Sequence, residues 1–510
     1  MHPFPRQRAA EAFLNDMSFS LLTEPWIPLI ATDGRRQEAS LLEALLDPER
    51  WRGVDGANPI ETLSLYRLLL AICHRAFGPS ADVRSDLLET WPKQALRVYL
   101  ERWAEHFDLL HPQTPFLQVP ALADSNLIPS PWTRLALERA SGANRMIWDH
   151  SIDAKPTPIR FAEAARQLVA HLQFTPGGLV KALRTSAVRG PACGLLLMLP
   201  VGECLQHTLA LGLIQQNSER FAADLPSWER QAPTLEQLRE PTELVLEGPA
   251  HRYTFLSRAV LLIADGEHIS HLIYGEGLVT SKASNPQVDP MAGIITGKKG
   301  PIPLLISEQK AFWRDFHVLQ GSGGATAAAT VSHAAGIREE MGESQPIRLL
   351  AGGLLPDQDK IILWRQEERN LAPALLQSKN LITASQKALE LAEQTGSAFN
   401  KAVYKLCSNW LQRGSEKPPD PKDIRALQQS IQASASFWGS LEPAFWSFVT
   451  TLGSSRDPEA SLTQWRQSLA DATKAAWQEA ATSLGLDSRA ITALGQSDYH
   501  KRKILAMIKN

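Results

Sequence analysis

Two lysines that stand between glycines are the first residues in this sequence whose types and spacing suggest chemistry. Residues 293–300 read "GIITGKKG". A phosphate-binding loop places four residues between its glycines and follows its lysine with Ser or Thr. Here three residues separate Gly293 from Gly297, and Lys299 stands where the hydroxyl belongs, so the pattern disfavours nucleotide hydrolysis. We expect a hairpin whose Lys298 and Lys299 either are solvated or reach into the groove of a polymer.

A second candidate is the glycine-rich segment 175–191, "TPGGLVKALRTSAVRGP". Gly177 and Gly178 precede Lys181, Arg184 and Arg189 in a predicted tight loop. Glycines let the backbone approach a ligand closely and can expose amides to phosphate. An ordinary turn explains the same residues, and both interpretations stay open at this point.

The third candidate lies in residues 352–364, "GGLLPDQDKIILW". Its Pro-Asp-Gln-Asp-Lys cluster between two apolar runs is typical of a turn, which predicts a hairpin with Gln358 at its tip and Asp357 and Asp359 on either side. A plain surface hairpin is the alternative to a functional tip.

No enzyme signature stands out elsewhere. The histidines form no HExxH or HxH pattern, and no GxSxG elbow occurs. The four cysteines form no CxxC pair, which argues against a disulfide framework or a zinc knuckle and suits a reducing cytoplasm. We therefore predict no catalytic residue, no metal site and no cofactor.

The bulk composition is that of an ordinary globular protein, with 44% hydrophobic and 21% charged residues and a net charge of −2. No apolar run approaches the length of about 18 residues that spans a membrane, and the start of the chain lacks the apolar core of a secretory signal. Residues 371–510 carry 16 Lys and Arg against 12 Asp and Glu. This mildly basic segment and the near-neutral whole leave local binding of nucleic acid open.

Periodicity predicts an α+β fold. An Asp-Gly turn between apolar runs predicts a hairpin near residues 27–39, and helical spacing follows from about residue 41 to 107 and from 160 to 173. Strand-like runs dominate from about 240 to 370, after which the pattern is helical. We expect residues 1–16 to be a disordered extension, residues 17–370 a mixed α+β body, and residues 371–510 an antiparallel helical bundle of the four-helix type.

Several blocks in a fixed order connect these features to a known family. They are "LLTEPWIPL", "HPQTPFLQ", "SGANRMIW", the glycine segment, "GKKG" followed by "AFW", and "LLAGGLLPDQDKIILWRQ". Together they resemble the large subunit of the type I-E CRISPR Cascade, the CasA family. The resemblance covers nearly the whole chain from Met17.

The resemblance implies roles for the three candidates. Gly177 and Gly178 look like the family's glycine loop behind the duplex of the protospacer-adjacent motif (PAM), and Lys298 or Lys299 looks like its minor-groove lysine. Gln358 matches the wedge that parts the first base pair. The family's loop that docks near the guide RNA corresponds to residues 144–153, and its residues are Asn144, Arg145, Trp148 and Asp149, with Trp148 as the expected anchor.

The implied function is a non-catalytic subunit of an RNA-guided surveillance complex in antiviral defence. Its expected partners are the other Cascade subunits, guide RNA, double-stranded target DNA and a helicase–nuclease, with no membrane and a cytoplasmic location. Asp357 and Asp359 depart from the family pattern, because carboxylates repel DNA phosphates, although aspartate can accept a hydrogen bond from cytosine or guanine. A metal-dependent nuclease or a purely structural scaffold is the alternative.

Overall fold

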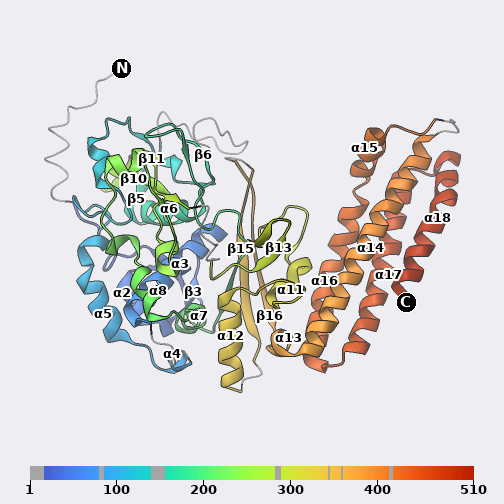
Figure 1. Ribbon diagram of the computed structural model, residues 1–510, viewed down its shortest axis with the longest axis horizontal. Coiled ribbons are helices and arrows are strands. Elements are labelled where there is room, and N and C mark those ends of the chain that lie inside the picture. The colour runs from blue at the N-terminus through green and yellow to red at the C-terminus, as the bar shows by residue number, and fades with distance from the viewer. Residues whose placement is uncertain are drawn as a thin grey trace. The chain divides into compact units, whose positions relative to one another are not determined.

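The computed structural model describes residues 17–79, 85–138, 156–281, 289–342, 345–357, 360–412 and 417–509. The chain divides into two compact units, each with its own set of elements (Figure 1). The body consists of Met1–Glu308, Ala327–Glu343 and Ile347–Asn370, and the helical unit consists of Gln309–Thr326, Ser344–Pro346 and Leu371–Asn510.

The strands of the body are short until the last pair. In chain order they are β1 (Ile27–Ala31), β2 (Arg36–Ala39), β3 (Trp51–Val54), β4 (Ser130–Pro131), β5 (Ile159–Arg160), β6 (Gly178–Leu179), β7 (Ser186–Ala187), β8 (Leu197–Val201), β9 (Glu243–Leu244), β10 (Arg258–Asp265), β11 (His268–Glu276), β12 (Val279–Thr280), β13 (Ile294–Gly297), β14 (Gly300–Pro303), β15 (Ile347–Asp357) and β16 (Lys360–Leu371).

The α-helices of the body lie between these strands. They are α2 (Leu41–Leu46), α3 (Pro59–Phe77), α4 (Asp86–Glu89), α5 (Lys93–Arg102), α6 (Phe161–Phe174), α7 (Leu205–Gly212), α8 (Ser218–Ala223), α9 (Leu235–Arg239), α10 (Pro249–Tyr253) and α12 (Ala329–Glu340).

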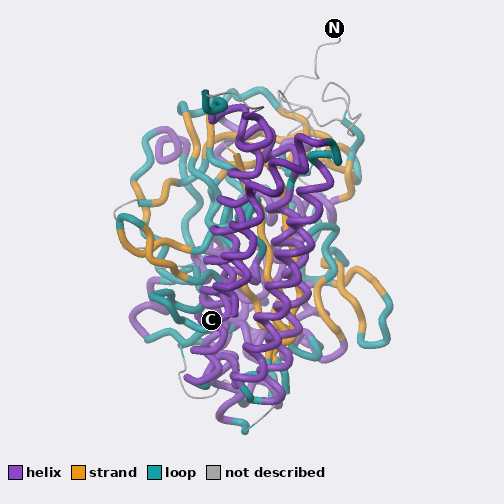
Figure 2. Tube along the Cα trace, turned by 90° about the vertical axis from the view of Figure 1, so that its right-hand side faces the viewer, coloured by secondary structure: helices purple, strands orange, loops and turns teal. Residues whose placement is uncertain are grey.

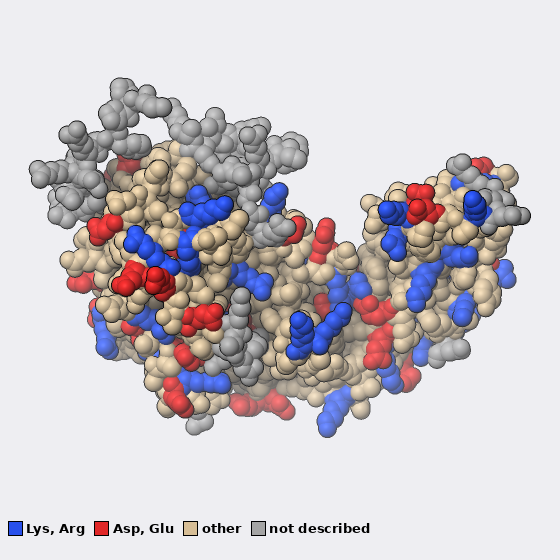
Figure 3. Space-filling model, turned by 45° about the horizontal axis from the view of Figure 1, so that its top comes forward, with Lys and Arg blue, Asp and Glu red and all other residues tan. Residues whose placement is uncertain are grey.

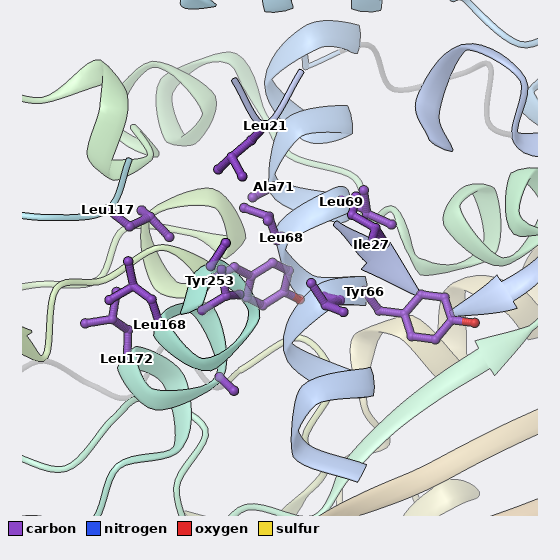
Figure 4. Packing of buried hydrophobic residues seen from close by; sticks show 14 of the residues in the cluster. Leu21, Ile27, Tyr66, Leu68, Leu69, Ala71, Leu117, Leu168, Leu172 and Tyr253 are labelled. Carbon is purple, nitrogen blue, oxygen red and sulfur yellow. The ribbon is translucent and has the colours of Figure 1, made fainter. Parts of the chain in front are cut away.

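Helix α3 forms the centre of the body. Every residue from Ile60 to His74 of this mostly apolar helix is buried, so α3 is surrounded by protein on all sides. Asn58 caps its first turn by accepting hydrogen bonds from the amides of Ile60 and Glu61. Figure 4 shows Leu68 of α3 in the same buried cluster as Leu168 of α6 and Tyr253 of α10.

Small sheets surround this core. One sheet has the order β2-β1-β3, a second has the order β10-β11-β4 with β5 also on β11, and a third has the order β16-β15-β8. The pairs β6-β7, β9-β12 and β13-β14 form separate ribbons. The hairpin predicted near residues 27–39 is confirmed by the antiparallel β1-β2 pair.

The helical unit is built from long helices that run alongside one another (Figure 2). They are α14 (Lys379–Gln412), α15 (Pro421–Ile431), α16 (Ala433–Ser455), α17 (Pro458–Ser483) and α18 (Ser488–Lys509), preceded by the short α11 (Phe316–Leu319) and α13 (Ala374–Gln377). In α17 an apolar stripe that includes Leu462, Trp465 and Leu469 is buried, and Gly485 follows the helix end with φ +96°.

An aromatic segment outside the main run of helices completes the core of this unit. The 3₁₀ helix η6 (Phe312–Asp315) places the Trp313 ring 4.9 Å from Phe445 and 6.2 Å from Trp465, measured between ring centroids. Residues 309–326 were expected within the body of residues 17–370 but pack with the helices. Their role depends on contacts far apart in sequence, which periodicity does not reveal.

The mixed α+β fold class is confirmed, with small sheets in the body and a separate set of long helices. Among the described residues, no helix is both long and apolar enough to cross a membrane.

Candidate nucleic-acid interface

The twin lysines occupy a two-residue turn, as the sequence predicted. Strands β13 and β14 pair with Gly297 opposite Gly300, so Lys298 and Lys299 form the tip of the hairpin, and both are exposed. Gly300 has φ +119°, a conformation that suits glycine and disfavours other residues. The turn thus presents two positive charges on a short, narrow ribbon.

The base of this lysine hairpin is anchored in the core. The Met198 amide donates to the Met291 carbonyl at 2.7 Å, which ties the strand β8 to the segment before β13. Just before Met291, Asp289 pairs with Arg67 of α3 at 2.8 Å, and both side chains are fully buried. The Arg67 guanidinium also lies 4.1 Å from the Tyr253 ring centre. A paired buried charge holds its segment firmly, because separating the pair would leave an uncompensated charge in the core.

The glycine segment forms a second small hairpin. Strands β6 and β7 pair through Gly178 opposite Ala187. A Cβ on Gly177 would stand 3.1 Å from the Arg189 amide nitrogen, so the absence of a side chain allows the two arms to approach closely. Lys181 adopts φ +58° and is exposed, as is Arg189. The close approach of the two arms explains why a glycine stands at position 177. Contact between this segment and DNA stays a prediction.

Not every basic residue in this segment is available to a ligand. The Arg184 guanidinium donates to three carbonyls, those of Ser186, Leu238 and Gly277. Desolvation by burial lowers its pKa. Arg184 therefore anchors the segment, and Lys181 and Arg189 are left as its exposed cations.

The third hairpin is formed by β15 and β16, which are neighbours in one sheet. Asp357 ends β15 and is exposed. Gln358 and Asp359, the remaining tip residues singled out in the sequence, lie outside the described residues. Two glycines let this hairpin pass close to neighbouring backbone. A Cβ on Gly352 would stand 2.7 Å from the Arg365 carbonyl oxygen, and one on Gly353 would stand 2.2 Å from the Leu195 carbonyl oxygen.

All three hairpins meet at one short segment, residues 190–197, which precedes and enters β8. A Cβ on Gly194 would stand 3.7 Å from Nη1 of Arg189, at the end of the glycine segment, and 3.8 Å from Cδ of Pro356, in the β15–β16 hairpin. The Ile306 amide, just after the lysine hairpin, donates to the Gly194 carbonyl at 3.0 Å. Segments separated by more than 150 residues are thus brought together.

This convergence was not visible in the sequence. Gly194 is unremarkable in "PACGLLLMLP", although its φ of +85° requires the freedom of glycine. The predicted guide-docking residues Asn144, Arg145, Trp148 and Asp149 lie outside the described residues and are not placed.

Charge is unevenly distributed over the surface. Figure 3 shows Lys and Arg along the helices of the helical unit, with fewer Asp and Glu between them. On α14, Lys401 and Lys405 are exposed one turn apart, and on α18 Asp498 pairs with Lys501 and Arg502. Exposed lysines of this kind can contact phosphates without reading sequence.

The described residues contain no group of three or more His, Cys, Asp or Glu side chains placed to hold a metal ion. The buried histidines are structural. His171 contacts the Leu135 carbonyl and the Tyr274 hydroxyl, and burial together with the nearby Arg258 lowers its pKa to about 3. The thiols of Cys73 and Cys193 are buried and free, and burial raises their pKa, to about 12 for Cys193.

The architecture of a mixed body and a helical unit agrees with a family of CRISPR-associated proteins. Residues 20–476 match the model of the family described as CRISPR-associated protein Cse1. The chain belongs to this family.

Individual relatives agree with that assignment. The chain is 34% identical over 505 residues to the CRISPR-associated protein CasA/Cse1 of Thermus thermophilus, a match that covers 96% of this chain and 97% of the relative. The crystal structure of CasA from Thermus thermophilus superposes with a TM-score of 0.84 at 31% identity, over 96% of this chain and 100% of that one. A chain from a solved CRISPR RNA-guided surveillance complex shares the fold, with a TM-score of 0.75 at 22% identity, over 96% and 99% of the two chains.

Proposed function

We propose that this chain is the subunit of a CRISPR RNA-guided surveillance complex that recognises the PAM and begins strand separation. Membership of the Cse1 family and the shared fold with a chain of such a complex support the assignment to the complex. The convergence of the three hairpins at Gly194 is the observation that carries the finer part of the proposal.

The proposed reading of the PAM uses the minor groove. Lys298 or Lys299 enters the groove, while Gly177 and Gly178 allow the backbone to lie close to the duplex. The minor groove mainly distinguishes A·T from G·C, so a reader of this kind accepts several related motifs. Guide pairing then reads the remaining sequence, which explains why the protein needs few base contacts.

Strand separation is assigned to the tip of the β15–β16 hairpin. Unstacking and unpairing a base step costs a few kcal/mol, and an inserted side chain offsets part of that cost where opening begins. Gln358 is the proposed wedge, and Asp357 and Asp359 would contact bases rather than phosphates. The exposed lysines of the helical unit would hold duplex and displaced strand through phosphates.

The remaining assignments concern partners. We propose that the loop containing Trp148 docks near the guide RNA and neighbouring subunits, and that the body offers a surface to the helicase–nuclease. The chain itself is proposed to be non-catalytic. A magnesium-dependent nicking assay on the isolated chain tests this point, and robust cleavage would favour a nuclease instead.

The lysine hairpin provides the test of PAM binding. We expect Lys298→Ala/Lys299→Ala to weaken binding of a PAM duplex by the assembled complex and to reduce the slope of log affinity against log salt by roughly 1 to 2, because each phosphate-contacting lysine releases about one counterion. If the lysine enters the groove without contacting a phosphate, its substitution should instead lower the preference of the complex for PAM over scrambled duplexes. Binding is measured on PAM and scrambled-PAM duplexes at several salt concentrations.

The matched control is Arg97→Ala/Arg102→Ala, which removes two exposed charges from α5, far from β13 in Figure 1. This control should leave the PAM preference unchanged. Equal affinity, selectivity and salt slope in the lysine variant and the unmodified complex would contradict the assigned role of the hairpin.

A further inference from the structure

A buried pair of opposite charges lies behind the glycine segment. Arg258 and Glu276 stand directly opposite each other on the paired strands β10 and β11, and their exposed fractions are 2% and 0%. We propose that Arg258 and Glu276 are positioning residues for the DNA interface, which set the shape of residues 176–189 before DNA binds. This inference rests on the proposed function.

Arg258 holds the two arms of the segment. Its Nη2 donates to the Pro176 carbonyl and its Nη1 to the Val188 carbonyl, each at 2.5 Å. Pro176 comes just before the glycines and Val188 just after β7, so one guanidinium joins the entry of the loop to its exit. The planar guanidinium presents several donors in fixed directions, which suits it to make both contacts at once.

Glu276 holds the tip. Its carboxylate accepts hydrogen bonds from the amides of Ala182 at 3.2 Å and Leu183 at 2.8 Å. These successive amides are the kind of donors that an anion would otherwise seek, and here a side chain of the protein already fills that place. Phosphate binding at this tip must therefore use the exposed side chains rather than these amides.

The segment needs such external support because it has little of its own. The β6–β7 ladder is two residues long, and Lys181 at the tip has a left-handed backbone. Without anchors the loop would be ordered only on binding, and the lost conformational entropy would weaken the complex. The pair anchors arms and tip to a long strand pair and leaves Lys181, Arg189 and the 69% exposed Leu179 facing outward.

Both side chains are buried and do not face DNA, which separates the effect of the pair from that of a phosphate contact. Loosening the loop should weaken PAM-duplex binding without changing the number of counterions released. The expected signature is thus lower affinity at constant salt slope, whereas loss of a phosphate contact changes both.

The test uses Glu276→Gln and Glu276→Ala in the assembled complex. Amide hydrogen exchange at Ala182 and Leu183 should accelerate, more in the alanine variant, because glutamine keeps one acceptor oxygen. PAM-duplex affinity should fall on the order of tenfold, which corresponds to about 1.4 kcal/mol, with an unchanged salt slope. Protection of β10 and β11 reports that the body is still folded.

A second variant covers the case in which the Glu276 variants fail to assemble. Arg184→Gln removes an anchor from the loop itself, since Arg184 donates to the carbonyls of Leu238 and Gly277 at 2.5 and 2.6 Å. It leaves the buried pair intact and should give the same faster exchange and lower affinity.

The outcomes distinguish this inference from the function on which it rests. If Lys181→Ala/Arg189→Ala leaves affinity and salt slope unchanged, the loop does not contact DNA, and the proposed role of the loop fails. The positioning role is overturned by a different pair of results. In that case Lys181→Ala/Arg189→Ala weakens DNA binding, but the Glu276 or Arg184 variant shows faster amide exchange in the loop with unchanged DNA affinity.

Discussion

The buried Arg67–Asp289 pair shows how a single interaction supports the lysine hairpin from a distance. Removing one partner leaves the other charged and desolvated in the core. We expect Asp289→Asn to lower the free energy of unfolding by about 3 to 5 kcal/mol. Urea denaturation of the unmodified and Asp289→Asn proteins measures this difference in the free energy of unfolding.

The control for this prediction is the exposed Lys93, which pairs with Asp47 and Glu49, and Lys93→Ala should cost no more than about 1 kcal/mol. Similar losses for the two variants would show that burial does not determine the strength of the Arg67–Asp289 pair.

Gly353 allows the β15–β16 hairpin to leave the core beside Leu195. In Gly353→Ala the new Cβ would meet the Leu195 carbonyl oxygen at 2.2 Å, so the strand must move. We expect a loss of about 1 to 3 kcal/mol in stability and slower strand opening by the assembled complex. The matched control is Gly439→Ala in α16, which meets nothing within 4 Å and should be neutral or stabilising. Equal behaviour of both variants would contradict the close approach at Leu195.

Two buried histidines make the stability of the body depend on pH. Desolvation lowers the pKa of His171 and His251 to about 3, with further contributions from Arg258 and Arg134 near His171 and from Arg230 and Arg252 near His251. Below about pH 6.5 the unfolded chain binds protons that the folded chain does not, so stability is full above that pH and falls as the pH falls.

Urea unfolding at pH 7.5, 6.5 and 5.5 measures this effect. Each histidine should contribute a slope of up to about 1.4 kcal/mol per pH unit below pH 6.5, and His171→Gln should remove one contribution. Stability that stays constant down to pH 5.5 would be incompatible with neutral buried histidines.

At the scale of elements, local signals in the sequence predicted much of what forms. The Asp-Gly and Lys-Lys turns depend on neighbours within a few residues, and both are found in the structure. The convergence of the three hairpins at Gly194 and the placement of Trp313 depend on contacts between segments distant in sequence. Local sequence patterns therefore do not predict them. Arg258 and Glu276 did leave a weak signal, a charge at one end of each of two apolar strands.

The segment before α11 gives a prediction for the helical unit. Trp313→Ala should destabilise that unit by about 3 to 5 kcal/mol, because it empties the space among Trp438, Phe445 and Trp465. For comparison, Trp364→Ala on β16 removes a ring from a residue that is 36% exposed and should cost much less. Thermal unfolding followed by far-UV circular dichroism measures both, and comparable losses would mean that Trp313 does not complete the helical core.

At the scale of the whole molecule, the chain combines an acidic body, in which residues 1–370 hold six more acidic than basic residues, with a mildly basic helical unit. The whole carries a net charge of −2, while residues 371–510 contain four more basic than acidic residues. Strong DNA binding by the isolated chain is therefore not expected, since the phosphate contacts are few and local. We expect most of the binding energy to come from the assembled complex and its guide RNA.

The rate of R-loop formation tests the central claim most directly. Gln358→Ala complexes should open a fully paired PAM duplex more slowly than unmodified complexes. They should regain the normal rate on a duplex whose first base pairs beyond the PAM are already mismatched and open, because that substrate no longer needs a wedge. An unchanged rate on the fully paired duplex, or an equal defect on both substrates, would contradict the account.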